Sequence, residues 1–150
     1  MSEINTQAQN YWDAFWNRKE KPKSVSAWQF GGNPDELAKL VMDGVKTATC
    51  SGHVFYEIER EPLPKVDDYS IVLNSSDEPV CIIRTTEVTI CPLNKVSEVF
   101  AYDEGEGDRS YDYWKSVHVQ FFRKALIEVD LEFSEDMLLV CERFELINVK

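Results

Sequence analysis

The stretch NPDELAKLVMDGVKTATC, residues 33–50, contains the most clearly bounded helix of the sequence and the extended segment that follows it. Asn33 is a preferred N-cap residue, Pro34 suits the first helical position, and the acidic residues after it complement the positive end of a helix dipole. Gly44 stands where a helix C-terminus often adopts a left-handed conformation. The stretch therefore predicts a helix from Pro34 to just before Gly44. Its predicted buried face consists of Leu37, Leu40 and Val41.

Segments rich in β-branched residues follow this helix. YSIVLN (69–74) and PVCIIRTTEVTIC (79–91) are separated by the turn-like SSDE, which predicts an antiparallel hairpin. LLVCERFELINV (138–149) is a third strand. Residues 92–126 predict a short helix, an acidic loop and a longer helix. Because helices and strands segregate along the chain, we expect the α+β class with a mostly antiparallel, barrel-like sheet.

The N-terminal part adds one helix and one strand. Residues 5–18 carry an aromatic face at helical spacing, which predicts an amphipathic helix packed on the core, or a homodimer surface if this face is exposed. SVSAWQFGG (24–32) predicts a strand that enters a Gly-Gly turn. We expect one domain over residues 1–150, in which 1–23 form the helix and a linker and 24–150 form the core.

Composition and charge restrict the classes of partner. The chain has 150 residues and a formal net charge of -11, from 27 acidic and 16 basic side chains. This charge argues against broad adhesion to nucleic acid or to an anionic membrane, although one small basic pocket stays compatible with it. No apolar run approaches the roughly 18 residues of a membrane span, and the N-terminus lacks a signal peptide. We therefore expect a cytoplasmic protein.

The cysteines and histidines give no metal or disulfide signal. The four cysteines are scattered without a CxxC pair, and there are only two histidines. This pattern predicts reduced thiols rather than a disulfide framework, with no metal site and no cofactor.

Lys46, Thr47 and Thr49 gather directly after Gly44. One explanation is capping, since the last turn of a helix attracts cations. The alternative is a site in which a buried lysine loses its proton and acts as a base, or stays charged and binds an oxyanion. In a regular strand, Lys46 and Thr49 would point to opposite faces. A joint role therefore requires the chain to turn after Gly44.

Three other positions could carry chemistry. AYDEGEGD (101–108) is either a solvated acidic turn or the source of a general acid or base, and the calcium-loop order fails because Trp114 stands where the bidentate glutamate belongs. His118 borders an apolar helical stripe, so it is either a core residue or a catalytic one. Arg84 lies in a predicted strand and faces either the interior or water.

Five segments taken together resemble the ASCH domain family, and the resemblance spans Trp28 to Leu146. The segments, in order, are WQFG, GVKTAT, AYDEGEGD, YWKSVHVQFF and VCERFEL. ASCH domains are similar to PUA RNA-modification modules. The resemblance therefore implies a small PUA-like β-barrel flanked by helices, with a cleft that binds RNA or a nucleotide.

The resemblance also implies a function. The family's G-x-K-x-x-T motif falls on Gly44, Lys46 and Thr49, and the glutamate of its acidic motif falls on Glu104. One small member hydrolyses N4-acetylcytidine with a lysine, a threonine and a glutamate, and another branch includes a metal-independent ribonuclease. This implies a metal-independent hydrolase that acts on RNA or a modified nucleoside. The alternatives are a non-catalytic RNA- or nucleotide-binding module and a small interaction protein.

The predicted site has a catalytic part and a binding part. The net charge favours a nucleoside, nucleotide or short single strand as ligand over an extended duplex, and aromatic residues could stack on a base. The predicted catalytic residues are Lys46, Thr49 and Glu104. The predicted substrate-binding residues are Trp28, Thr47, Arg84, Trp114 and His118.

Overall fold

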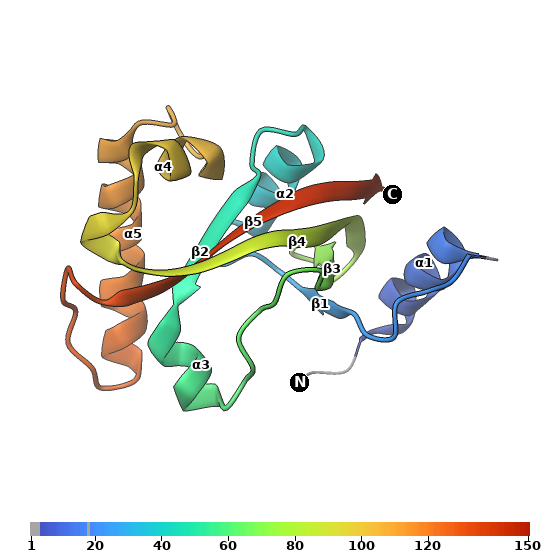
Figure 1. Ribbon diagram of the computed structural model, residues 1–150, viewed down its shortest axis with the longest axis horizontal. Helices are drawn as coiled ribbons and strands as arrows, with labels where there is room; N and C mark the ends of the chain where they lie inside the picture. Colours follow the sequence, from blue (N-terminus) through green and yellow to red (C-terminus); the bar gives the residue numbers. More distant parts are fainter. Residues whose placement is uncertain (1–3, 18) are drawn as a thin grey trace.

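The structure, a computed structural model, describes residues 4–17 and 19–150. Within these residues, five strands form one mixed sheet in the order β1-β3-β4-β5-β2, which curls into a half-barrel (Figure 1). β1 runs parallel to β3, and the other neighbouring strands are antiparallel. The predicted α+β class, the hairpin and the C-terminal strand are confirmed. The strands are β1 (Ser26–Trp28), β2 (Ala48–Gly52), β3 (Tyr69–Leu73), β4 (Pro79–Pro92) and β5 (Leu138–Val149).

Helices surround this sheet. In Figure 1, α4 and α5 lie together beside one end of the sheet, and α1 lies at the opposite end. The α-helices are α1 (Thr6–Trp16), α2 (Pro34–Met42), α3 (His53–Glu59), α4 (Glu98–Glu104) and α5 (Tyr111–Glu128), and a short 3-10 helix covers Leu93–Lys95. Among the described helices, none is long and apolar enough to cross a membrane.

Three hydrophobic clusters hold the helices on the sheet. The first joins α4 and α5 to β2 and β5 around Phe122, and the second joins α2 to β3, β4 and β5 around Val41. The third joins α1 to β3 and β4 around Trp12, so the aromatic face of α1 packs on the sheet as core residues do. Arg18, where the sequence predicts the end of this helix, lies outside the described residues.

The end of α2 has the predicted geometry. Asn33 caps the helix by accepting a hydrogen bond from the backbone N–H of Glu36 (3.3 Å), and Gly44 has a φ of 77°. The N–H groups of Val45 and Lys46 then both donate to the carbonyl of Leu40, at 2.9 and 3.1 Å. The chain therefore folds back on the last turn of α2 before β2 begins.

Two local predictions need correction, and one helix was not predicted. The acidic segment 101–108 is helical over its first half, so Glu104 is the last residue of α4 rather than a loop residue. Ala38 is buried beside Val41, whereas Leu37 and Leu40 are only partly buried. The sequence also gave no indication of α3. That helix has no side-chain cap and no buried residue, so the usual signals of a helix are absent from it.

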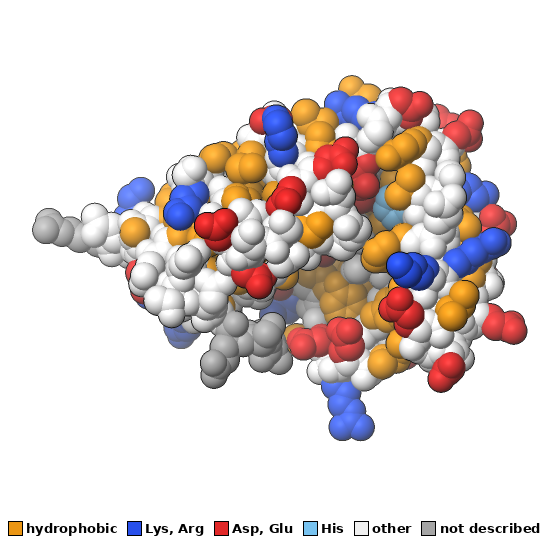
Figure 2. Space-filling view, turned by 180° about the vertical axis from the view of Figure 1, so that it is seen from behind, with side chains coloured by type: hydrophobic (Ala, Val, Ile, Leu, Met, Phe, Trp, Pro, Cys, Tyr) orange, Lys and Arg blue, Asp and Glu red, His pale blue; other side chains and the backbone are white. Residues whose placement is uncertain are grey.

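Charges are mixed on one face of the molecule. On the face that Figure 2 shows, lysine and arginine side chains are spread among acidic ones instead of forming one continuous patch. Affinity for a long polyanion comes largely from lysine and arginine side chains that neutralise its phosphates, and this face has no continuous patch of them.

Candidate functional site

A cleft of about 220 Å³ opens between β2, α5 and the loop that joins β1 to α2. All three predicted catalytic residues line this cleft: Lys46, Thr49 and Glu104. The other lining residues come mainly from two sources. From the β1–α2 loop and the start of α2 come Phe30, Gly31, Gly32, Asn33, Glu36 and Leu37, and from α5 come Tyr113, Val117, His118, Phe121 and Phe122.

Lys46 lies at the centre of the polar part of the cleft. Its side chain is 1% exposed, and its Nζ lies 3.2 Å from Oε1 of Glu104, 3.2 Å from Oε2 of Glu106 and 3.3 Å from the backbone carbonyl of Glu104. An ammonium group has three protons to donate, and each has an acceptor here. The arrangement is therefore that of a charged lysine, balanced by two carboxylates.

The fold-back after Gly44 explains how Lys46 reaches this position. Lys46 precedes β2, and the N–H of Thr47 donates to the carbonyl of Asp103 (2.8 Å) rather than joining a strand ladder at that point. Lys46 is therefore free of the two-residue alternation of a strand. The turn that a joint role of Lys46 and Thr49 requires is present.

Glu104 has its carboxylate buried at the end of α4, with 1% of the residue exposed. Oε2 accepts a short hydrogen bond from Nε1 of Trp114 and a weaker one from the thiol of Cys50 at 3.4 Å. Burial by itself raises the pKa of Glu104, but the charge of Lys46 and the contacts from His118 and Trp114 outweigh it and lower the pKa to about 2. The carboxylate is therefore ionised in the folded protein.

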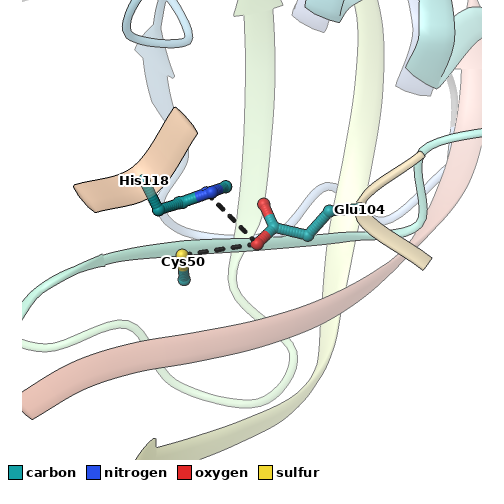
Figure 3. A group of neighbouring side chains, drawn as sticks. All are labelled: Cys50, Glu104 and His118. Atoms are coloured by element: carbon teal, nitrogen blue, oxygen red, sulfur yellow. Dashed lines mark hydrogen bonds and ion pairs between the residues drawn. The ribbon is translucent and has the colours of Figure 1, made fainter. Parts of the chain in front are cut away.

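His118, on α5, completes the polar group of the cleft, which consists of Lys46, Glu104 and His118. Its Nδ1 lies 2.7 Å from the backbone carbonyl of Trp114, which can only accept, so Nδ1 carries a proton. Its Nε2 lies 3.4 Å from Oε2 of Glu104 (Figure 3). Burial lowers the pKa of His118, but the hydrogen bond and charge of Glu104 raise it more, and the net direction is upward. The imidazole therefore lies between the backbone of α5 and the carboxylate of Glu104.

Of the five predicted substrate-binding residues, the cleft wall includes His118. Trp114 is 2% exposed and lies behind Glu104, to which it donates its indole N–H. Trp28 packs edge-on against Phe30 and belongs to the hydrophobic cluster under α2. Both tryptophans therefore support the wall from behind rather than facing a ligand.

Thr47 and Arg84 also lie outside the cleft wall. The Thr47 side chain is exposed and makes a 3.4 Å contact with the carbonyl of Asp103. Arg84 is on β4, where Asp67 and Glu145 on the protein surface hold its guanidinium at 2.6 and 2.7 Å. Two carboxylates thus hold Arg84 outside the lining of this cleft, and its role in substrate binding stays a prediction.

The cleft contains residues that the sequence reasoning did not single out. Glu106 is two residues beyond Glu104 in the acidic segment, and only its contact with Lys46 reveals it. Val117 and Phe121 belong to the apolar helical stripe that His118 borders, and Tyr113, four residues before Val117, extends that stripe by one turn.

Cys50, Glu104 and His118 form a set of donors that could hold a metal ion. One ligand atom from each lies within 4.8 Å of the others, and the three side chains point toward one another in Figure 3. A tetrahedral zinc site with sulfur, nitrogen and oxygen ligands has ligand atoms about 3.3 to 3.7 Å apart, and the two distances to Oε2 of Glu104 are both 3.4 Å. A zinc ion here would take the carboxylate and the imidazole out of their present contacts.

The pKa of the Cys50 thiol is raised well above its usual range by burial first and by the charge of Glu104 second. The thiol therefore keeps its proton, and the S–H group donates a hydrogen bond to Glu104. A metal would have to displace that proton, since a thiolate is the ligand form.

The comparison with known proteins identifies the family. The sequence model of the ASCH domain matches residues 26–148. A crystal structure of an ASCH domain from Lactobacillus crispatus JV V101 is 34% identical with a TM-score of 0.90, and covers 97% of each chain. A protein from Enterococcus faecalis V583 is 41% identical with a TM-score of 0.85, over 96% of this chain and 94% of that one. Among curated protein sequences, none matches significantly. With its half-barrel and motif cleft, the chain belongs to the ASCH domain family.

Proposed function

We propose that the protein hydrolyses an amide bond of a modified nucleoside in this cleft, with Lys46, Thr49 and Glu104 as the catalytic residues. The observation that carries the proposal is the meeting of a charged lysine, a buried carboxylate and a threonine in one small cleft. ASCH domains are associated with RNA-binding PUA-like modules, which supports a ligand that carries a nucleobase.

The size and charge of the cleft favour a nucleoside over RNA. Its volume of about 220 Å³ is below the roughly 300 to 1,000 Å³ of pockets that enclose drug-sized ligands. Glu36, Glu104 and Glu106 line it, and both sidechain carboxylates nearest Lys46 already neutralise that cation. A phosphate would have to displace a carboxylate to reach the lysine. This weakens the two alternatives, RNA cleavage and phosphate capture without turnover.

The proposed reaction uses the hydrogen bond between Lys46 and Glu104. Lys46 and Glu104 are both charged before substrate binds. A substrate that displaces water removes the remaining solvation of the two charges, and this favours transfer of the proton from the ammonium to the carboxylate. The neutral amine then accepts the hydroxyl proton of Thr49. The Thr49 oxygen attacks the amide carbonyl and forms an acyl ester, while the restored Lys46 ammonium stabilises the oxyanion. Glu104 gives its proton to the departing amine. Water then hydrolyses the ester, which releases the acid and restores Thr49.

The test is turnover of N4-acetylcytidine by purified protein in the presence of a chelator, measured by release of cytidine. We expect Lys46→Ala, Thr49→Val and Glu104→Gln each to lower kcat by at least a hundredfold, in the range of general-base loss. Lys39→Ala is the matched control, because that lysine is exposed, pairs with Asp43 and does not line the cleft.

Three results would contradict the proposal. Turnover that survives Lys46→Ala would remove the assigned chemistry. Cleavage of single-stranded RNA without release of cytidine would favour the ribonuclease, and Lys46-dependent RNA binding without any turnover would favour the binding module. Thermal melting of each variant must accompany the assays, since a lost fold mimics a lost site.

A further inference from the structure

We propose that Phe121 is the surface on which the nucleobase of the ligand stacks, and that Tyr113 closes the opposite end of the cleft. The class of ligand rests on the proposed function, whereas the stacking surface rests on the geometry of α5. The experiment below separates the two.

Phe121 and Tyr113 are large aromatic side chains left open to the cleft. Phe121 is 45% exposed and Tyr113 is 40% exposed, although both residues line a concave site. The tryptophan nearest the polar group, Trp114, is 2% exposed and stacks on His118 at 4.4 Å between ring centroids, so its face is not available to a ligand. Exposed rings in a cleft lose the hydrophobic gain of burial until a planar ligand covers them.

Each of the two rings lies directly against a glycine. A Cβ added to Gly31 would lie 3.1 Å from Cζ of Phe121, and one added to Gly107 would lie 2.4 Å from the ring of Tyr113. Both glycines belong to segments that border the cleft, the turn after β1 and the acidic segment after α4. The absence of side chains at these positions is what allows the rings to lie where they do. A side chain at either position would displace the ring that lies against it.

The spacing along α5 places the polar group between the rings. Eight residues separate Tyr113 from Phe121, which is about 12 Å along a helix axis. His118 is three residues before Phe121 and therefore on the neighbouring turn of the same side. A base stacked on Phe121 thus has its substituents within reach of the imidazole and of the Lys46–Glu104 pair beside it.

The ligand that suits this arrangement has a planar ring with a polar substituent. Phe30 borders the same end of the cleft, and the Lys46 ammonium lies 5.5 Å from the centre of its ring, so apolar and charged walls meet there. A nucleobase has such a combination of a flat π-face and polar edges, whereas a sugar or a phosphate lacks the flat face.

The experiment compares uridine with 5,6-dihydrouridine, which has the same polar groups on a puckered, saturated ring. Affinities for the purified protein are measured by calorimetry, with cytidine, N4-acetylcytidine and ribose as further probes. We expect uridine to bind about tenfold to a hundredfold more tightly than dihydrouridine, as loss of one stacking contact predicts. Phe121→Leu should abolish that ratio while it keeps an apolar side chain. Gly31→Ala should also lower the affinity for uridine, because the added methyl group displaces the ring of Phe121.

Tyr102→Leu is the control, because Tyr102 is a 52% exposed aromatic residue that does not line the cleft. Equal binding of uridine and dihydrouridine, nucleoside binding unchanged in Phe121→Leu, or ribose binding as tight as nucleoside would each overturn the proposal. A stacking ratio without turnover of N4-acetylcytidine would instead leave the stacking surface in place and defeat the proposed hydrolase. Turnover of N4-acetylcytidine by Phe121→Leu with an unchanged KM would leave the proposed hydrolase in place and defeat the stacking surface.

Discussion

Lys46 and Glu104 are each about 1% exposed, so removal of either one leaves the other as a buried charge with a missing partner. We expect Lys46→Met to destabilise the fold by about 3 to 5 kcal/mol, and Glu104→Gln to have a cost in the same direction. The double variant should recover about 0.5 to 3 kcal/mol relative to the sum of the single changes. Urea unfolding of the four proteins measures this coupling, and additive single costs would argue that the pair is not an energetic unit.

The free energy of unfolding should depend on pH through Glu142, which lies on β5 with its side chain on the face opposite Cys141. Burial raises the pKa of Glu142 to about 7; the hydrogen bond from Thr85 lowers it by less, and the charge of Asp68 adds a still smaller increase. A carboxyl group with a raised pKa favours the folded state below its unfolded value near 4.5, and this contribution is lost as the pH rises through about 7.

Glu142→Gln should therefore gain about 1 to 2 kcal/mol over the wild type at pH 8 and little at pH 5. His118 also has a raised pKa and loses its stabilising contribution as the pH rises, so His118→Gln must be measured in parallel. A pH profile of unfolding that Glu142→Gln leaves unchanged would contradict the assignment.

At the scale of elements, two glycines join α2 and α4 to the cleft and differ in what surrounds them. Gly44 has a φ of 77° with open space where a Cβ would lie, and Gly105 has a φ of 75° with the Val45 carbonyl 2.8 Å from that position. Gly44→Ala should cost about 1 to 2 kcal/mol from backbone strain alone.

Gly105→Ala should cost more, because the same strain is joined by a clash with backbone that cannot move aside. It should also lower turnover, since the clash separates the acidic segment from the chain that leads to Lys46. Thermal melting and kcat of the two variants make the comparison, and equal losses of stability would show that the contact with Val45 is not a constraint.

The donors of the possible metal site come from three elements, β2, α4 and α5, and they predict inhibition by zinc. Zinc held by Cys50, Glu104 and His118 would occupy the carboxylate that the proposed reaction needs. We expect micromolar Zn²⁺ to reduce turnover of N4-acetylcytidine and a chelator to restore it. Cys50→Ala should weaken this inhibition by tenfold or more, whereas Cys91→Ala, a change outside the cleft, should not. Identical inhibition of both variants would place the zinc elsewhere.

For the whole molecule, a net charge of -11 predicts how ligand binding responds to salt. A protein that makes 6 to 10 phosphate contacts loses roughly a thousandfold to a hundred-thousandfold in affinity between 50 and 200 mM salt. Nucleoside binding in the cleft should change less than about threefold over that range, since no phosphate is held. A steep salt dependence for any bound nucleotide or RNA would argue for a backbone-binding surface instead.

The oligomeric state also belongs to this scale. The aromatic face of α1, on which the dimer prediction depended, packs against β3 and β4. The homodimer therefore stays a prediction, and the aromatic face of α1 no longer supports it. Light scattering of the purified protein measures the oligomeric state.

Local chemistry in the sequence was sufficient for several elements. The Asn33 cap, Pro34 and Gly44 define α2 because caps and turns depend on neighbouring residues, and the β-branched runs define β3, β4 and β5 because strand preference is also local. α3 was not predicted, because it has neither a side-chain cap nor a buried face. The resemblance to a known family, rather than periodicity, brought Glu104 together with Lys46 and Thr49.

The tertiary structure alone decided the state and surroundings of those residues. Whether Lys46 is charged depends on Glu104 and Glu106, which are 58 and 60 residues away in the chain, and on the fold-back after Gly44 that brings them into contact. The sequence determined by itself that a lysine follows a well-capped helix. Only the packing of α4 and α5 against β2 determined that this lysine is buried between carboxylates, because burial and long-range charge are properties of the assembled chain.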